Sequence, residues 1–351
     1  MSAYIQGMGN ISPQKTWDES GLLDQPLVYT GDKLWCHEPD YSKYIDPKHL
    51  RRMSRIIKMG VAAGSIALKE AGVSVPNGII TGTAYGCLED TGIFLNKMID
   101  NKEYALNPTP FIQSTHNTIG SQIALLLQCQ GYNQTYTQGA FSFESALLDA
   151  ILELADSPAQ SLLVGGVDEI TATSHALQKR FGVFRNTENN LDLFKPALDG
   201  TVNGEGAAYF VLSGEKGPNK QVSIDAVRML YKPQDAVVKK EIESFIESAG
   251  LKSSDIDFVL LGKSGDQKLD TKTDEIAKMY FGSSSIGLFK HLSGEYPTAS
   301  GFALWLAAKI IQENHIPDTV VLRNTKRPMK RVLIYNPYFG THHSLILLSS
   351  C

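Results

Sequence analysis

An internal repeat constrains the fold of this chain more than any other feature. Residues 65–72 have the pattern of a helix that stops at a glycine, and an apolar strand follows at residues 78–82. Far downstream, residues 244–250 end in the same way and precede an apolar strand at residues 257–262. Glycine after alanine is a frequent helix stop because glycine adopts the left-handed conformation without strain. The same supersecondary unit is therefore predicted twice.

A second matched pair follows in the same order of strand, turn, helix and apolar strand. Helices that alternate with continuous apolar strands are typical of parallel sheets covered on both faces. Two matched pairs in register indicate a duplication, so we expect a layered α/β/α/β/α core. Its halves are predicted at residues 1–215 and 216–351, packed as one compact unit. The matched runs are residues 134–137, 139–140, 142–154 and 161–164, and then 284–289, 294–295, 299–311 and 319–322.

Composition and charge exclude several classes of protein. The 351 residues are 42% hydrophobic and 20% charged, which is typical of a globular chain rather than a disordered one. A net charge of −4 argues against a nucleic-acid binder that works through bulk charge. The most apolar stretch, residues 302–311, is too short to span a bilayer, and the N-terminus lacks a signal-peptide pattern. Cys36, Cys87, Cys129 and Cys351 lie far apart without zinc-ligand spacing, which predicts a cytoplasmic protein without a metal site.

Candidate chemistry lies at the two predicted crossings from strand to helix. A residue at the tip of such a turn faces a helix N-terminus, whose free N–H groups stabilise a thiolate or an oxyanion. These turns fall within residues 137–142 and 290–295. Two further clusters are the glycine-rich run at residues 199–208 and the segment 336–344 near the C-terminus.

These four clusters resemble the β-ketoacyl synthase family of the thiolase superfamily over essentially the whole chain. Asp199-Gly200 with Gly204-Glu205-Gly206-Ala207 is similar to the DG…GEGA signature of the family, which is the most specific match. Lys290 through Gly294 resembles its KSxxGH segment, and Tyr338 through Thr341 resembles its glycine-rich gating loop. The resemblance implies the thiolase-like fold, a duplicated five-layer α/β/α/β/α sandwich.

The resemblance also implies a loss of the catalytic groups. Active members of the family condense acyl groups with a cysteine nucleophile and two histidines. A gapless count back from Ala150 puts Ala140 in the place of the nucleophile. Gly262 and Glu295 stand where the two histidines are expected, and only the lysine of the second segment is retained, as Lys290. We therefore expect no catalytic residue at these positions, and no cofactor.

A chain with this pattern resembles chain-length-factor subunits, the inactive partners of ketosynthases. The resemblance implies a heterodimer with an active β-ketoacyl synthase, an acyl carrier protein as second partner, and a role in shaping the acyl tunnel. Such pairs serve polyketide, aryl-polyene and other fatty-acid-type pathways. The implied dimer-forming residues are Thr115, His116 and Asn117, and the implied tunnel and gate residues are Gln138, Phe141, Tyr338, Phe339 and Gly340.

Basic residues at positions 51–58 offer a docking surface for an acidic carrier protein. Arg51, Arg55 and Lys58 have the spacing of one helical face, and Arg52 lies beside them. Local positive charge on a protein of net negative charge attracts an acidic partner by complementarity. The alternative is a solvated helix face without a partner.

Several alternatives remain open at this point. Gln138 matches the glutamine of chain-length factors only with a shift of two residues, so the simpler interpretation is a polar residue at a strand end. An active acyltransferase would need relocated groups such as Ser142, Cys129, His116 or Glu295. For Glu295 the simpler interpretation is a helix-capping carboxylate, and for His116 and His291 it is a hydrogen-bonded structural role. A third hypothesis is a homodimeric acyl- or carrier-binding protein without an active partner.

Overall fold

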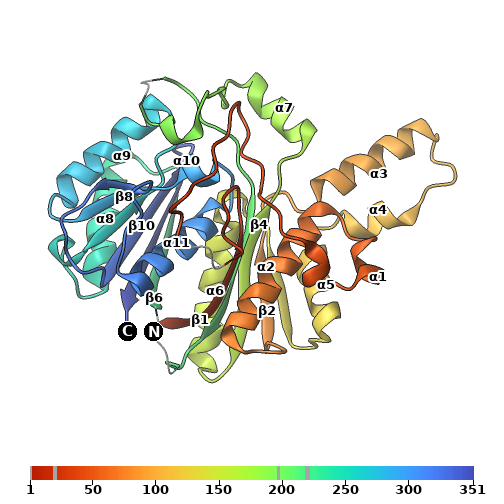
Figure 1. Cartoon of the computed structure of the whole chain (residues 1–351), viewed down its shortest axis with the longest axis horizontal. Coiled ribbons are helices and arrows are strands. Elements are labelled where there is room, and N and C mark those ends of the chain that lie inside the picture. The colour runs from red at the N-terminus through yellow and green to blue at the C-terminus, as the bar shows by residue number, and fades with distance from the viewer. Residues whose placement is uncertain (1, 19–21, 196–197, 218–221) are drawn as a thin grey trace.

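The computed structural model describes residues 2–18, 22–195, 198–217 and 222–351 (Figure 1). Within these ranges one mixed sheet of 11 strands runs in the order β3-β2-β4-β5-β1-β6-β11-β10-β7-β8-β9. The strands are β1 (Ala3–Ile11), β2 (Gly78–Gly82), β3 (Tyr132–Tyr136), β4 (Ser161–Asp168), β5 (Gly206–Ser213), β6 (Val222–Tyr231), β7 (Phe258–Leu261), β8 (Ser285–Leu288), β9 (Val321–Arg323), β10 (Arg331–Tyr338) and β11 (His342–Ser350).

Helices cover the sheet on both faces and also lie between its two halves (Figure 1). The α-helices are α1 (Pro47–Leu50), α2 (Arg55–Ala71), α3 (Leu88–Asp100), α4 (Pro108–Gln113), α5 (Thr118–Leu127), α6 (Ser142–Asp156), α7 (Ala172–Arg180), α8 (Asp235–Ser248), α9 (Gln267–Tyr280), α10 (Lys290–Ser293) and α11 (Ala299–Glu313). Short 3₁₀ turns are η1 (Tyr41–Lys43), η2 (Gly139–Phe141), η3 (Asn190–Asp192) and η4 (Ser253–Asp255). None of the helices in the described ranges is long and apolar enough to cross a membrane.

The strand order repeats with two-fold symmetry. The first five strands run β3-β2-β4-β5-β1, and the corresponding strands of the second half run β8-β7-β10-β11-β6 from the other end of the sheet. The halves meet where β1 pairs with β6, and this pairing covers only Ala3–Ile5 of β1. The predicted repeat is thus visible in the arrangement of the strands.

Three hydrophobic cores produce the five layers. The inner core holds α6 and α11 between the two halves of the sheet, with side chains such as Leu162 of β4 and Leu260 of β7. An outer core packs α2 and α5 against the first half, and Leu163 of β4 belongs to it. The third core packs α8 and α9 against the second half. Because adjacent side chains of a strand point to opposite faces, a fully apolar strand such as β4 serves two cores at once.

The predicted helix stops are confirmed. Gly72 ends α2 with a φ of +68°, and Gly250 follows α8 with a φ of +71°. An L-residue with a side chain adopts this left-handed conformation only at a cost, which explains the glycine at both ends.

Two details of the expected topology are wrong. The sheet is mixed rather than parallel, because β5, β1, β6 and β11 all join their neighbours in antiparallel pairs. The counterpart of β4 is β10, which pairs in parallel with β7, and not the run at residues 319–322. That run contributes to β9, a short antiparallel strand at the sheet edge, where Leu322 is 57% exposed. An apolar triplet at an edge cannot be told from a buried strand by composition alone.

Candidate functional site

The turn between β3 and α6 is sharp and closed by its own hydrogen bonds. Gly139 has a φ of +59°, and Ala140 behind it is buried. Ser142 Oγ accepts the N–H of Gln138 at 2.9 Å and donates to the carbonyl of Gly139 at 2.7 Å. The side-chain oxygen of Gln138 accepts a hydrogen bond from Ser145 Oγ. The two polar side chains nearest to the turn are therefore engaged in holding it, and Ala140 presents only a methyl group.

The second crossing carries a buried ion pair. Lys290 Nζ donates to Glu295 Oε2 at 2.7 Å and to the carbonyl of Pro337 at 3.1 Å, and both side chains of the pair are fully buried. Burial raises the pKa of Glu295 to about 7, although the charge of Lys290 opposes the shift. Glu295 Oε1 has no hydrogen-bond partner in the described part of the chain.

Two glycines hold this crossing against the glycine-rich run at residues 203–208. A side chain on Gly204 would place its Cβ 2.1 Å from the carbonyl oxygen of Ser293, and one on Gly294 would lie 2.4 Å from the Cα of Gly204. The N–H of Gly204 donates to the carbonyl of Glu295 at 3.1 Å, so the two backbones are in direct contact. Close backbone approach of this kind requires glycine.

Gly262 directly follows β7, and it is the third position at which the family resemblance implies a lost catalytic group. Its N–H donates to the carbonyl of Tyr335 at 2.8 Å. A Cβ at this position would lie 2.3 Å from Asn336 Oδ1 and 3.0 Å from the Cα of the same asparagine. A side chain here therefore requires the amide of Asn336 to rotate away and its backbone to give by a few tenths of an ångström.

A small cavity of about 10 Å³ adjoins Glu295, and its walls include Tyr85, Asp168, Glu169 and Tyr338. This volume has room for about one water molecule. Burial raises the pKa of Asp168 to about 6 and that of Glu169 to about 8. Near neutral pH Glu169 therefore holds its proton, whereas Asp168 is mostly ionised.

The glutamate of the glycine-rich run, Glu205, anchors the N-terminus of α2. Its fully buried carboxylate accepts two hydrogen bonds from Arg55, at 2.6 and 2.5 Å. The N–H groups of Cys36 and Ile170 complete the shell at 2.8 and 2.9 Å. A second carboxylate, Glu38, also accepts from Arg55. Arg55 is therefore a structural cation that links segments 150 positions apart.

The predicted basic surface is only partly present. Helix α2 begins at Arg55, and α1 ends at Leu50, so the expected helical face through residues 51, 55 and 58 is wrong. The cause is a break before Ser54, the N-cap of α2, that the charge spacing does not reveal. Arg51 and Arg52 are exposed between the two helices, and Lys58 is half-buried on α2.

One buried titratable group escaped the sequence analysis. Glu144 lies in the first turn of α6, and neither of its carboxylate oxygens has a hydrogen-bond partner among the described residues. Burial raises its pKa to about 6, with Ser300 of α11, Ser344 of β11 and the charge of Lys290 acting in the opposite direction. Glu144 lies four residues after Ala140. An acidic residue in a helix normally indicates an exposed face, so no local pattern marks its burial.

The predicted gate residues belong to one aromatic cluster. Phe141 contacts the His342 ring edge-on at 4.7 Å between ring centroids, and Tyr338 contacts it at 6.1 Å. Phe339 packs on Tyr338 at 4.5 Å, and Gly340 completes the turn with a φ of +63°.

The predicted dimer residues Thr115, His116 and Asn117 lie exposed between α4 and α5. The helix that follows them, α5, packs against the edge strand β3, which pairs only with β2 in the described sheet. Two large apolar side chains are exposed beside this edge, since Leu125 of α5 is 66% and Tyr132 of β3 is 40% exposed.

The residues considered for a relocated mechanism do not meet at one site. Cys129 Sγ donates to the carbonyl of Pro76 at 3.2 Å, and His116 packs over Gly86 at the surface. His291 is buried, with Nε2 donating to the carbonyl of Thr319 at 2.7 Å, and burial lowers its pKa to about 4. Within the described ranges, no group of three or more His, Cys, Asp or Glu side chains is placed to hold a metal ion.

Comparisons with known proteins agree on one family. The model of the β-ketoacyl synthase N-terminal domain matches residues 5–216. The chain is 24% identical to the 3-oxoacyl-[acyl-carrier-protein] synthase 2 of Synechocystis sp. over 59% of this chain, a match that spans about half (51%) of that relative. It is 21% identical to the Staphylococcus aureus 3-oxoacyl-[acyl-carrier-protein] synthase 2 over 90% of this chain and 89% of the other.

Solved structures show the same fold at low sequence identity. The ishigamide ketosynthase/chain length factor matches with a TM-score of 0.80 and 18% identity. A β-ketoacyl synthase from Burkholderia phymatum STM815 matches with a TM-score of 0.81 and 17% identity. Both alignments cover 100% of this chain and 99% of the other. The whole chain therefore has the mixed α/β, thiolase-like fold of these structures.

Proposed function

The chain belongs to the β-ketoacyl synthase family, and from this premise we propose that it is a non-catalytic subunit of the chain-length-factor kind. The observation that carries the proposal is Ala140 at the turn between β3 and α6. A methyl group cannot form the thioester on which condensation by this family depends.

The two other aligned positions support the same conclusion. At Gly262 a side chain would collide with Asn336, and at Glu295 a carboxylate is held in an ion pair with Lys290. The cavity beside Glu295, at about 10 Å³, is far smaller than the several hundred Å³ that a ligand pocket usually needs. In this proposal Ala140, Gly262 and Glu295 contribute to packing, and the condensation reaction takes place in a partner subunit.

The proposed partner is an active β-ketoacyl synthase, bound through the surface formed by α5 and β3. An edge strand offers unpaired backbone groups, and exposed apolar side chains beside it favour burial against another chain. A hollow of about 470 Å³ on this surface is lined by residues that include Leu125, Gln128 and Asn133. In this proposal an acyl carrier protein delivers the acyl substrate to the active subunit. Its acidic surface would bind Arg51 and Arg52 of this chain.

Co-expression with a ketosynthase encoded beside it tests the proposal. We expect a stable heterodimer in size exclusion, and elongation of acyl-carrier thioesters only when both subunits are present. Intact mass of this chain after incubation with acyl-carrier thioesters should show no covalent adduct. An adduct mapped to Ser142 or Cys129, or elongation by this chain alone, would overturn the proposal in favour of an acyltransferase with relocated groups.

The pairing surface has its own test. Leu125→Arg places a charge on the surface formed by α5 and β3, and it should abolish co-purification of the ketosynthase without lowering the melting temperature of this chain. Val237→Arg is the matched control, because Val237 is also an exposed apolar residue, 43% accessible, but lies on α8. Equal loss of pairing in both variants would show that the partner binds elsewhere.

A further inference from the structure

A slot of about 300 Å³ lies between the helices α2 and α5 and the segment that carries η1 and α1. Its volume is at the lower end of the usual range for small-molecule sites. Its apolar walls belong to the outer core of the first half, and it shares no lining residue with the cavity at Glu295. The slot is therefore separate from the aligned catalytic positions.

The walls of the slot are mainly branched aliphatic side chains. These are Ile45, Val61, Leu68, Ile123, Leu126 and Leu127. Leu126 and Leu127 are half-buried at the opening, and the other four are buried and close the floor. Such walls favour an aliphatic chain over a polar molecule. A methylene group fills roughly the volume of a water molecule in the liquid, about 30 Å³, so the slot has room for about ten carbon atoms.

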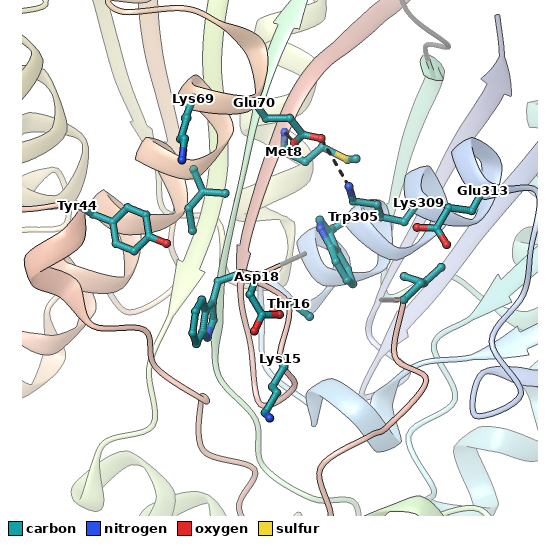
Figure 2. Close-up of a pocket in the computed structure, with 13 residues that line it drawn as sticks. Met8, Lys15, Thr16, Asp18, Tyr44, Lys69, Glu70, Trp305, Lys309 and Glu313 are labelled. Carbon is teal, nitrogen blue, oxygen red and sulfur yellow. Dashed lines mark hydrogen bonds and ion pairs between the residues drawn. The ribbon is translucent and has the colours of Figure 1, made fainter. Parts of the chain in front are cut away.

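Most polar groups in the slot are already engaged. Asp46 accepts the N–H of Lys48 at 2.8 Å as the N-cap of α1, and Ser65 Oγ donates to the carbonyl of Val61 at 2.8 Å. Tyr44 lies between the slot and a second cleft of about 510 Å³, and Figure 2 shows its hydroxyl on the side of that cleft. The exposed side chain of His49 has no partner among the described residues, so it is free to meet a polar group at the opening.

A basic hollow of about 580 Å³ adjoins the slot, and the two share His49. The hollow is lined by five exposed residues: Pro47, Lys48, His49, Arg51 and Arg52. Within the described ranges Lys48, Arg51 and Arg52 form no ion pair, and Asp46 is the single acidic residue that lines either space. An anionic group at the mouth of the slot would therefore meet unpaired cations.

The larger cleft beyond Tyr44 lacks this preference for one sign of charge. Three cations and three anions line it: Lys15, Lys69, Lys309, Asp18, Glu70 and Glu313. Lys309 and Glu70 also pair with each other at 3.5 Å, as the dashed line in Figure 2 marks. Mixed charge of this kind does not select an anion or a cation, whereas the slot has apolar walls and a basic mouth.

We propose that the slot and the basic hollow together bind an anionic amphiphile. An unbranched aliphatic chain of about eight to ten carbons lies in the slot, and a negatively charged head group lies against Arg51 and Arg52. The site needs only this chain, so it does not depend on the proposed role beside a ketosynthase. Because the head group covers the two arginines offered above to a carrier protein, the amphiphile and the carrier protein would compete.

Calorimetry of octanoate binding to the isolated chain at low salt tests the proposal. We expect octanoate to bind about 3- to 5-fold more tightly than 1-octanol, which lacks the charge, and octylammonium to bind more weakly than either. Hexanoate should bind about 10-fold more weakly than octanoate, because it buries two methylene groups fewer. Octyl phosphate distinguishes the two common anionic heads, and its tighter binding would assign a phosphate rather than a carboxylate.

One variant places the aliphatic chain. Ser65→Leu fills the slot and should weaken octanoate and 1-octanol alike, by about 10-fold or more. Ser248→Leu on α8 is the matched control, because Ser248 is exposed and its hydroxyl also donates to a carbonyl one turn earlier, that of Phe245 at 2.7 Å. The control should bind octanoate as the wild type does, and thermal melts check that both variants are folded.

A second variant places the charged head. Arg51→Gln combined with Arg52→Gln should weaken octanoate about 3- to 5-fold and leave 1-octanol unchanged. Both side chains are exposed, so this variant does not depend on repacking of the slot. Lys97→Gln, at an exposed lysine of α3, is its control and should change nothing. Absence of octanoate binding at millimolar concentration, equal affinity for octylammonium, or unchanged affinity in Ser65→Leu or in the double arginine variant would overturn the proposal.

Discussion

Lys290 Nζ lies 2.7 Å from Glu295 Oε2, and neither side chain is exposed to solvent. A fully buried ion pair stabilises a protein less than its short distance suggests, because both charges have lost their hydration. Removal of one partner is costly for the same reason, since the other charge stays buried without compensation.

A double-mutant cycle on this pair should therefore be strongly non-additive. We expect Lys290→Met and Glu295→Gln each to lower the free energy of unfolding by about 3–5 kcal/mol at pH 8. The double variant should lose much less than the sum, because it leaves no unpaired charge. Urea denaturation of the four proteins measures the coupling, and simple additivity would show that the two charges act independently.

Glu144 should make stability depend on pH. Its pKa is about 6 in the folded protein and near the ordinary value of 4.5 in the unfolded chain, so the folded state holds its proton to higher pH. Between these values the folded state binds more protons, and stability falls as pH rises. The loss of stability that comes from ionising Glu144 in the folded protein is absent below pH 4.5 and complete above pH 6. It amounts to about 2 kcal/mol.

The variant Glu144→Gln removes this titration. Relative to the wild type, its free energy of unfolding should rise by about 2 kcal/mol between pH 4 and pH 8, because only the wild-type side chain must ionise in the core. Urea titrations at both pH values give the difference, in which the contributions of the other carboxyl groups cancel. A constant difference would mean that Glu144 is solvated or paired in solution.

The backbone contact at Gly204 predicts a sharp contrast between two alanine substitutions. Gly204→Ala should destabilise the protein by about 3 kcal/mol or more, since its Cβ would overlap the carbonyl of Ser293. At Gly282 a Cβ meets nothing within 4 Å, so Gly282→Ala should change stability by less than about 1 kcal/mol. Thermal melts of the two variants make the comparison, and equal melting temperatures would contradict the close approach.

Arginines of the basic stretch should divide into two classes. Arg55→Met leaves Glu205 buried without its cation, and we expect a loss of about 2–3 kcal/mol in the free energy of unfolding. Arg51→Ala and Arg52→Ala should leave stability unchanged, because both side chains are exposed. In the proposed complex these two variants should instead weaken carrier-protein binding about 3- to 5-fold, with the larger effect at low salt. If both variants bind the carrier protein as tightly as the wild type, the carrier protein does not dock at Arg51 and Arg52.

Local patterns were sufficient for much of the fold. The glycine stops at residues 72 and 250 and the apolar strand at 78–82 depend on nearest neighbours, and the structure has them as predicted. Strand direction and pairing depend on contacts between distant segments. No local sequence pattern therefore predicts that β5 pairs antiparallel with β4, or that β10 pairs with β7.

The candidate site divides in the same way. The assignment of Ala140, Gly262 and Glu295 rests on residue spacing within the clusters that resemble the family, and spacing needs no contact information. The sequence places Arg55 on an exposed basic helical face with Arg51 and Lys58, because charged side chains are usually solvated. Only the folded chain brings Arg55 to the carboxylate of Glu205. The burial of Glu144 likewise depends on α11 and β11, which are more than 150 residues away.

The contact between Gly262 and Asn336 has a consequence for the history of the chain. A single base change could introduce a side chain at position 262, and its Cβ would lie 2.3 Å from Asn336 Oδ1 and 3.0 Å from the Cα of Asn336. The Asn336 side chain would thus have to rotate away, and its backbone would have to give by a few tenths of an ångström. Positions 262 and 336 are therefore coupled in evolution, and we expect a side chain to enter at 262 most readily after a change at 336.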